Sequence, residues 1–417
     1  MMKREIITHH PNFFILISTF AWRYFKAKKS TNAINIIAWV SVTAITIGTA
    51  SLIIILSAFN GFESLVRSLY SSFYPDIRIS PKLGKTFILT AEQYKKITSI
   101  NGVKAVSLVI EEKALLKNGE LQTVVSIKGV DDQYPKVSGV PSNMFRGKFD
   151  LGNAASPKLV LGVGIENAVG VLSDRTLAPL SIYLPKKGVN DMVDPLNGLA
   201  VGEVMPAGSF AIQQEFDNGY ALTNLSFLKE NMGYGENEFS AVEIRVSNNN
   251  ALLAIQDAIK KLVGEALLVQ SRVEQNRSLY TTIRVEKWVI YGIFSLILLV
   301  AAFTMVGALT MLVLEKKQDI YILKALGADR SLIRRIFLAE GVLLAGIGAL
   351  SGIMIALILY YLQINYKLVP LQGQSFLIDY YPVTLVVSDF ILVSLTVIGI
   401  GALASWIPAY RSVNISE

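Results

Sequence analysis

The chain has 417 residues, a formal net charge of +7 and no cysteine; 52% of its residues are hydrophobic and 17% are charged. Soluble domains average about 25% charged residues, so this composition excludes an ordinary soluble enzyme and requires apolar segments in a membrane. The lack of cysteine excludes disulfides, thiolate metal sites and cysteine nucleophiles. His9 and His10, the only histidines, adjoin near the N-terminus, which argues against a histidine triad or a zinc centre.

Residues 1–33 are predicted to form a cytoplasmic N-terminal segment. Within it, residues 13–29 combine aromatic and aliphatic side chains with a basic end, which is typical of an interfacial helix on anionic lipid; a buried start of the first membrane span is the alternative. Residues 34–59 are predicted to be that first span, because they carry no charge and exceed the about 20 residues that a bilayer core requires. We expect a signal anchor rather than a cleavable signal peptide.

Residues 60–287 have the composition of a globular domain and are predicted to form a large extracytoplasmic α+β domain. A strand and a helix at each end, with a β-rich insert between them, indicate an α+β unit interrupted by a mainly β subdomain. Alternating apolar residues predict strands at residues 76–80, 121–128, 181–184, 209–213 and 242–246. Helical patterns cover residues 91–99 and 250–263.

Residues 185–200 of this domain are rich in glycine and proline and contain the exposed-looking apolar residues Met192, Val193 and Leu196. A projection of this kind is typical of a loop that docks another protein. An ordinary long hairpin connection accounts for the same residues equally well, so the sequence leaves both interpretations open.

Three further spans are predicted at residues 288–314, 336–362 and 384–408. The third span contains Glu340 and the fourth contains Asp389, each near a span end, where an ionised group costs less than at the centre. The connecting segments are then a cytoplasmic loop at residues 315–335, a short periplasmic loop at residues 363–383 and a cytoplasmic tail at residues 409–417.

Glycines within the third span predict close packing of helices. Gly348 and Gly352 are four residues apart, which lets two helix backbones approach each other. A dinucleotide-binding fingerprint does not fit this segment, since it lies inside a span.

The lysines and arginines indicate the orientation of the four spans. By the positive-inside rule, both termini and residues 315–335 are cytoplasmic, and residues 60–287 lie on the opposite side of the membrane. The net positive charge therefore reflects topology rather than nucleic-acid binding. The basic flanks consist of Lys3, Arg4, Arg23, Lys26, Lys28 and Lys29 before the first span, and of Lys316, Lys317, Lys324, Arg330, Arg334 and Arg335 between the second and third.

No catalytic constellation is expected, so the chain is predicted to be neither an enzyme nor a holder of a cofactor or metal. Gly84-Lys85-Thr86 lacks the earlier glycine of a phosphate-binding loop, because that position is Ile79. The pair Asp131-Asp132 has no clustered partners and predicts a solvated turn rather than a cation site.

The loop between the second and third spans is predicted to be two helices with a break. Ile320, Leu323 and Leu326 recur every three residues and form an apolar strip on the first helix. Gly327 can end that helix and Asp329 can cap the next one. A charged amphipathic helix between two spans is a suitable contact for a cytosolic partner; a surface turn is the alternative.

The motif E-K-x-x-D-I-x-I-L-K-A-L-G-A, which starts at Glu315 and is followed by I-x-x-I-F-L-x-E-G, resembles the signature of FtsX-like permeases. Further features are similar to the LolC/LolE family of lipoprotein-releasing ABC transporter permeases. These features are A-W-R-Y-F-K-A-K-K at residues 21–29, N-G-F-E at residues 60–63, P-D-I at residues 75–77, N-R-S-L-Y at residues 276–280 and R-V-E-K at residues 284–287.

The resemblance implies a permease subunit in the bacterial inner membrane, with a MacB-like periplasmic core domain. It implies a dimer with a second copy or a paralogue, a LolD-type cytosolic ATPase that binds ATP and Mg²⁺, and movement of lipoproteins from membrane lipid to a periplasmic carrier. A MacB- or FtsX-type permease that exports a peptide or activates a periplasmic hydrolase by mechanotransmission is one alternative. A membrane scaffold without energy coupling is another.

By the same resemblance, two groups of residues carry the function. The ATPase-coupling residues would be Glu315, Lys316, Lys317, Asp319, Ile320, Leu323, Lys324, Ala325, Leu326, Gly327 and Ala328. Residues 185–200 would be a hook that docks the carrier through Pro185, Lys186, Lys187, Met192, Val193 and Leu196.

Overall fold

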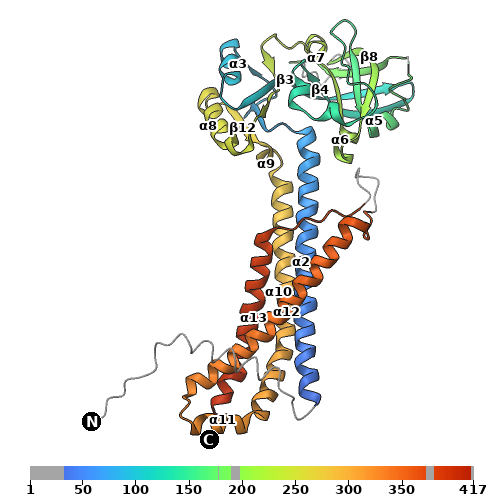
Figure 1. Cartoon of the computed structure of the whole chain (residues 1–417). Coiled ribbons are helices and arrows are strands. Elements are labelled where there is room, and N and C mark those ends of the chain that lie inside the picture. Colours follow the sequence, from blue (N-terminus) through green and yellow to red (C-terminus); the bar gives the residue numbers. More distant parts are fainter. Residues whose placement is uncertain (1–31, 177, 189–197, 372–379, 415–417) are drawn as a thin grey trace. The chain divides into compact units, whose positions relative to one another are not determined.

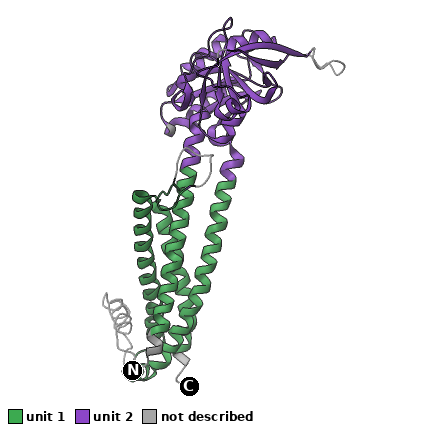
Figure 2. Ribbon diagram, turned by 90° about the vertical axis from the view of Figure 1, so that its right-hand side faces the viewer, with its two compact units in different colours: residues 1–64, 282–370, 380–417 green, residues 65–281, 371–379 purple. Residues whose placement is uncertain are grey.

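The structure is a computed structural model that describes residues 32–176, 178–188, 198–371 and 380–414 (Figure 1). The chain forms two compact units (Figure 2). The helix unit comprises Met1–Ser64, Thr282–Pro370 and Tyr380–Glu417, and the α+β unit comprises Leu65–Thr281 and Leu371–Asp379. The predicted interfacial helix at residues 13–29 lies outside the described residues.

Among the described residues, four helices are long and apolar enough to cross a membrane. The first three contain the predicted spans, and α13 overlaps the fourth but begins three residues after its predicted start. Two of them extend well beyond those spans, because α2 continues past Phe59 and α10 begins before Trp288. The bounds are α2 Asn32–Phe73, α10 Arg277–Glu315, α12 Arg330–Tyr366 and α13 Val387–Asn414; a short helix, α11 Lys317–Ala325, stands between α10 and α12.

Two glycines of α12 bring this helix into contact with α2. A Cβ atom at Gly348 would lie 2.7 Å from the Cγ2 atom of Ile45, and one at Gly352 would lie 2.7 Å from the carbonyl oxygen of Thr46. Any side chain at these two positions would therefore push the helices apart. Because lipid provides no hydrophobic force between helices, such close contact is a main source of their association.

A sheet of ten strands forms the centre of the α+β unit. Its order is β12-β1-β11-β3-β4-β9-β6-β8-β5, and β7 pairs with β3 and β8. The strands are β1 Ile77–Pro81, β3 Val103–Asn118, β4 Leu121–Val130, β5 Met144–Gly147, β6 Lys158–Gly162, β7 Leu180–Pro185, β8 Leu199–Phe210, β9 Tyr220–Asn224, β11 Ala241–Val246 and β12 Leu267–Ser271; a separate pair joins β2 Phe87–Ile88 to β10 Glu238–Phe239.

The helices of this unit are short, and several pack on the sheet: α7 contacts β3 and β4, and α8 contacts β12. Buried aliphatic side chains of the strands and of these helices form one hydrophobic core. The helices are α3 Ala91–Thr98, α4 Tyr134–Val137, α5 Val163–Ala168, α6 Gln214–Gly219, α7 Leu225–Met232, α8 Leu252–Val263 and α9 Arg272–Gln275, with single 3₁₀ turns at Val140–Asn143 and Asn249–Ala251.

Strand β3 makes the sheet continuous, which the sequence interpretation missed. The first half of this 16-residue strand pairs with β11, and its second half pairs with β4 and β7. The β-rich insert therefore joins the same sheet instead of forming a separate subdomain. All five predicted strands overlap an observed strand, although Ala211, Ile212 and Gln213 of the fourth prediction lie beyond the end of β8.

The end of α2 is part of the core of the α+β unit. Apolar residues of α2 continue at helical spacing as Phe62, Val66, Leu69 and Phe73. The Phe73 ring is buried and stacks on Phe216, with ring centroids 4.4 Å apart. The last turns of α2 therefore belong to the folding unit of the sheet.

We expect a fragment of residues 62–284 to fold alone, with mixed α and β circular dichroism, because it contains the complete core and the end of α2. In this fragment Phe73→Ala should lower the free energy of unfolding by about 3–5 kcal/mol, because it removes a buried ring. Circular dichroism measures the secondary structure of the fragment, and urea denaturation measures its free energy of unfolding. Phe145→Ala, at an exposed ring, is the control and should change stability by about 0.5 kcal/mol or less. A disordered spectrum would contradict the domain assignment.

Candidate functional site

The segment between α10 and α12 forms a compact bend in the helix unit. Helix α10 ends at Glu315, α11 follows after Lys316, and Gly327 ends the segment with a left-handed φ of 91°. The backbone N–H of Ala328 donates to the carbonyl oxygen of Leu323 at 2.9 Å. The side chain of Asp329 then accepts a hydrogen bond from the Leu332 N–H at 2.8 Å and caps α12. Glycine and a capping aspartate are what this geometry requires.

The predicted apolar strip is divided in the structure. Ile320 is 3% exposed and belongs to the core of the helix unit, Leu323 is half-buried, and Leu326 is 79% exposed. The physical reason is that a helix of 3.6 residues per turn advances about 600° over six residues, so Leu326 lies about 120° around the axis from Ile320. A single strip is therefore a wrong expectation: Ile320 anchors α11 to the bundle and Leu326 faces outward.

The exposed apolar residues of this segment include two that sequence reasoning missed. Tyr321 and Ile322 are exposed together with Leu326. Lys317 lies over the Tyr321 ring at 5.9 Å, and Lys316 forms an ion pair with Asp319 at 3.2 Å. Of the remaining predicted residues, Glu315, Lys324 and Ala328 are half-buried, whereas Ala325 and Gly327 are exposed. We name Tyr321, Ile322 and Leu326 the α11 outer face.

Three polar residues of different helices meet in the helix unit. The Nδ2 atom of Asn60 in α2 donates to Asp389 Oδ2 in α13 at 2.6 Å, and the Nζ atom of Lys287 in α10 donates to Asn60 Oδ1 at 2.7 Å. Lys287 and Asp389 also form an ion pair at 3.3 Å. Asn60 and Asp389 are buried. This polar triad joins the three helices near one end of their apolar spans, and because its members are far apart in sequence, only the fold brings them together.

Replacing one member of the polar triad should destabilise the bundle more than replacing two. Asp389→Ala leaves the Lys287 ammonium without its carboxylate, at a cost of about 3 kcal/mol. In Lys287→Met combined with Asp389→Ala no uncompensated charge remains, so much of that loss should be recovered. Thermal unfolding of the full chain in detergent measures both variants. Asp319→Asn, in the more exposed pair with Lys316, is the control and should change little; additive losses would contradict the coupling.

A second set of buried charges lies in the α+β unit. Lys128 of β4 and Glu243 of β11 form an ion pair at 2.7 Å, with side chains only 2% and 0% exposed. The Lys128 ammonium also lies 5.2 Å from the ring centroids of Phe73 and Tyr134. Burial acts to lower the pKa of Lys128, but Glu243 and Tyr134 outweigh it and raise that pKa above its ordinary value. Lys128 is therefore a permanent cation packed against the end of α2.

The segment at residues 185–200 connects two paired antiparallel strands. Pro185 at the end of β7 pairs with Leu199 at the start of β8. Lys187 is held at the base of this hairpin, because its Nζ atom forms an ion pair with Glu238 at 2.7 Å and its backbone N–H donates to the Met232 carbonyl oxygen at 3.0 Å. Lys186 is exposed. The apolar residues Met192, Val193 and Leu196 lie outside the described residues.

The predicted solvated turn at Asp131-Asp132 is wrong for the first of the two residues. Asp131 accepts hydrogen bonds from the Ser107 hydroxyl at 2.6 Å and from the Leu108 N–H at 3.0 Å, so it orders the loop after β4. Burial raises the pKa of this carboxyl more than the hydrogen bonds lower it. Among the described residues, no group of three or more acidic or histidine side chains could hold a metal ion.

The described residues contain four long apolar helices, and the strands of the α+β unit lie in sequence between the first two of them. A short helix stands between the second and the third. This architecture is that of a multi-span membrane protein of the permease class. The chain belongs to the family with a MacB-like periplasmic core domain, which matches residues 38–262. Residues 291–416 match the FtsX-like permease C-terminal family.

Relatives confirm the resemblance to the LolC/LolE family. The chain is 25% identical over 412 residues to the lipoprotein-releasing system transmembrane protein LolC of Neisseria meningitidis serogroup B, covering 95% of this chain and 97% of that protein. It is 27% identical to LolE of Haemophilus influenzae, covering 95% and 96%. It is 23% identical to the pyoverdine export ATP-binding/permease protein PvdT of Pseudomonas syringae pv. syringae, covering 81% of this chain and 50% of that protein.

Proposed function

We propose that this chain is the permease subunit of an ABC transporter that releases lipoproteins from the bacterial inner membrane to a periplasmic carrier. ATP and Mg²⁺ bind to a separate LolD-type ATPase, and a second copy of this chain or a paralogue completes the permease. The observation that carries the proposal is the likeness to LolC and LolE proteins along nearly the whole chain. The chain itself performs no chemistry; it converts closure of the ATPase into movement of helices.

The proposed topology places the α+β unit in the periplasm and both termini in the cytoplasm. Its support is the cluster of lysines and arginines around α11. On this topology α11 lies on the cytoplasmic side, within reach of the ATPase.

The α11 outer face is the proposed docking surface for the ATPase. Apolar side chains that are already exposed can be buried by a partner without any change of this chain. Ile320 links this surface to the bundle core, so a displacement of α11 is passed to neighbouring helices. Helix α10 is continuous for 39 residues, or about 58 Å at 1.5 Å per residue, and can carry such a displacement along its length.

A MacB-type exporter is the second candidate function, because the match to PvdT covers 81% of this chain. PvdT is named as both an ATP-binding and a permease protein, and this chain covers only half of the length of PvdT. The matches to the LolC and LolE relatives cover 95% of this chain and favour lipoprotein release. A scaffold without energy coupling predicts no ATPase in complex with the chain.

In proteoliposomes that contain the complete permease, formed by the chain with its second copy or paralogue, together with its ATPase and a lipoprotein, ATP should drive transfer of the lipoprotein to the carrier. Ile322→Asp and Leu326→Asp should each weaken ATPase binding about tenfold or more and lower release in proportion, because a charge replaces an apolar contact. Leu83→Asp, at an exposed leucine of the α+β unit, is the matched control. Ile320→Asp should unfold the bundle instead. Normal ATPase binding by both outer-face variants would remove α11 from the coupling, and failure of the unmodified chain to release lipoprotein would refute the function.

The hairpin between β7 and β8 is the proposed docking loop for the carrier. Replacing residues 189–197 with a short Gly/Ser loop should leave the hairpin base and ATPase binding intact, since Lys187 keeps its ion pair with Glu238. Handover of lipoprotein to the carrier should fall. A photoreactive residue at position 193 should form an adduct with the carrier. Normal handover by the shortened loop, together with no adduct, would leave the hairpin as a plain connection.

A further inference from the structure

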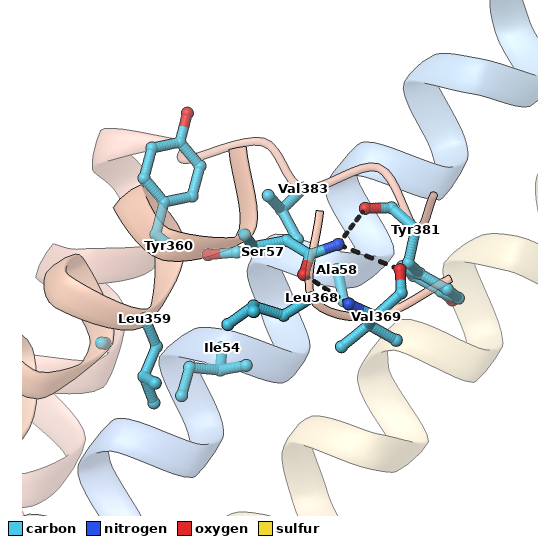
Figure 3. A pocket seen from close by; sticks show the side chains of 11 residues that line it. Ile54, Ser57, Ala58, Leu359, Tyr360, Leu368, Val369, Tyr381 and Val383 are labelled. Carbon is cyan, nitrogen blue, oxygen red and sulfur yellow. Dashed lines mark hydrogen bonds between the residues drawn. The ribbon is translucent and has the colours of Figure 1, made fainter. Parts of the chain in front are cut away.

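The helix unit contains an apolar cavity that the proposed function does not use. Its volume is about 380 Å³, within the range of ligand-binding pockets. It lies between α2, α12 and the segments that flank residues 372–379 (Figure 3). The lining residues are Ile54, Ser57, Ala58, Ala356, Leu359, Tyr360, Gln363, Leu368, Val369, Tyr381 and Val383.

Two polar side chains of the wall, Ser57 and Gln363, form hydrogen bonds within the protein. The Ser57 hydroxyl donates to the Ile53 carbonyl oxygen at 2.7 Å. The Gln363 amide donates to the carbonyl oxygens of Val369 and Tyr381 at 3.2 and 3.0 Å, and accepts from the Val369 N–H at 3.0 Å (Figure 3). The donors of Ser57 and Gln363 are therefore used within the protein. Because most of the other lining residues are apolar, the cavity is suited to a hydrocarbon.

The same hydrogen bonds hold the cavity in shape without a ligand. Gln363 joins the chain on both sides of residues 372–379, and the Tyr381 N–H donates to the Val369 carbonyl oxygen at 2.9 Å. The Thr384 N–H donates to the Ser57 carbonyl oxygen at 2.9 Å and fixes this segment to α2. A ligand that enters pays no cost of building the wall, which favours affinity.

The cavity is continuous with the outer surface of the bundle. Leu359, Leu368 and Val369 line it and are also exposed. Leu359 lies in α12, which is long and apolar enough to cross a membrane, and Leu368 and Val369 follow directly after the end of that helix. In a bilayer, exposed apolar side chains at these positions are expected to face lipid. An acyl chain can therefore reach the cavity sideways from the bilayer, without passing through water.

A cation lies next to the lining. Lys367 follows the end of α12 in a left-handed conformation with φ of 50°, and its backbone N–H donates to the Gln363 carbonyl oxygen at 2.9 Å. Its side chain is exposed, with the Nζ atom 4.5 Å above the centre of the Tyr380 ring. Leu368 and Val369 of the lining come directly after it. Lys367 thus supplies an exposed ammonium group directly before the lining in sequence, and a cation beside a buried chain is the partner that a lipid phosphate requires.

We propose that this cavity binds one acyl chain of a glycerophospholipid of the surrounding bilayer and that Lys367 contacts the phosphate of that lipid. The occupant is a resident membrane lipid, distinct from any transported molecule. It fills the space between α2 and α12 at the point where the segment around Tyr381 meets them, so it supports the packing of that end of the bundle.

Photolabelling of the full chain in vesicles of phosphatidylethanolamine and phosphatidylglycerol tests the proposal. A phosphatidylglycerol with a diazirine on one acyl chain should label peptides containing Ile54 and Leu359. Ala58→Phe, which fills the cavity, should lower this labelling about tenfold, and Lys367→Gln should lower it whereas Lys367→Arg should not. Leu350→Phe, at an exposed position of α12, is the matched control and should leave the labelling unchanged.

The stability of each variant is checked by its thermal unfolding. Leu359→Trp fills the cavity from α12 and repeats the test where Ala58→Phe does not fold. Labelling of Leu350 with none at Ile54 and Leu359, or undiminished labelling in the filled variants, would overturn the proposal. Displacement of the label by an acylated lipoprotein at equimolar concentration would also overturn it, because the cavity would then belong to the transported lipid.

Discussion

The packing of α2 is the contact on which both units depend. Along one face this helix meets Gly348 and Gly352 of α12, and further along it contributes Asn60 to the polar triad. At its end, Phe73 is buried against Phe216 and beneath the Lys128 ammonium. One continuous helix therefore contributes to a core held by close contact of backbones and to another held by aromatic burial.

Both units contain buried charges that form ion pairs. Lys128 and Glu243 are removed from water and form an ion pair, and the Lys128 ammonium also contacts two aromatic rings. Arg78 pairs with Glu111 at 2.8 Å in the same sheet. Buried pairs of this kind contribute little net stability compared with apolar residues of the same size. They do penalise every arrangement that separates the partners. In the sheet this fixes the register of β4 and β11 relative to the end of α2.

In the segment around α11, a buried anchoring residue lies within a few residues of the proposed docking surface. Ile320 is buried in the bundle, whereas Tyr321, Ile322 and Leu326 remain exposed. The left-handed Gly327 and the Asp329 cap hold α11 close to the start of α12. A short, well-anchored helix with an apolar outer face is suited to receive force from a partner, because little of that force is lost in a flexible connection.

The sequence by itself determined the parts that depend on local composition and spacing. The four spans follow from long, predominantly apolar runs. Periodicity indicated five strands and two helices of the α+β unit, and the motif at Glu315 identifies the family. Turn and cap residues such as Gly327 and Asp329 also act locally, so their roles were predictable. In each case the physical cause lies within a few residues of the chain.

Tertiary structure alone decided which of those residues meet. The extent to which Ile320 and Leu326 are buried depends on the bundle beside α11. The polar triad joins residues from three helices, and the cavity wall joins Gln363 to Tyr381. The long strand β3 merges the predicted insert with the rest of the sheet. These features arise from contacts between distant segments, whose energies no local pattern of apolar and polar residues encodes.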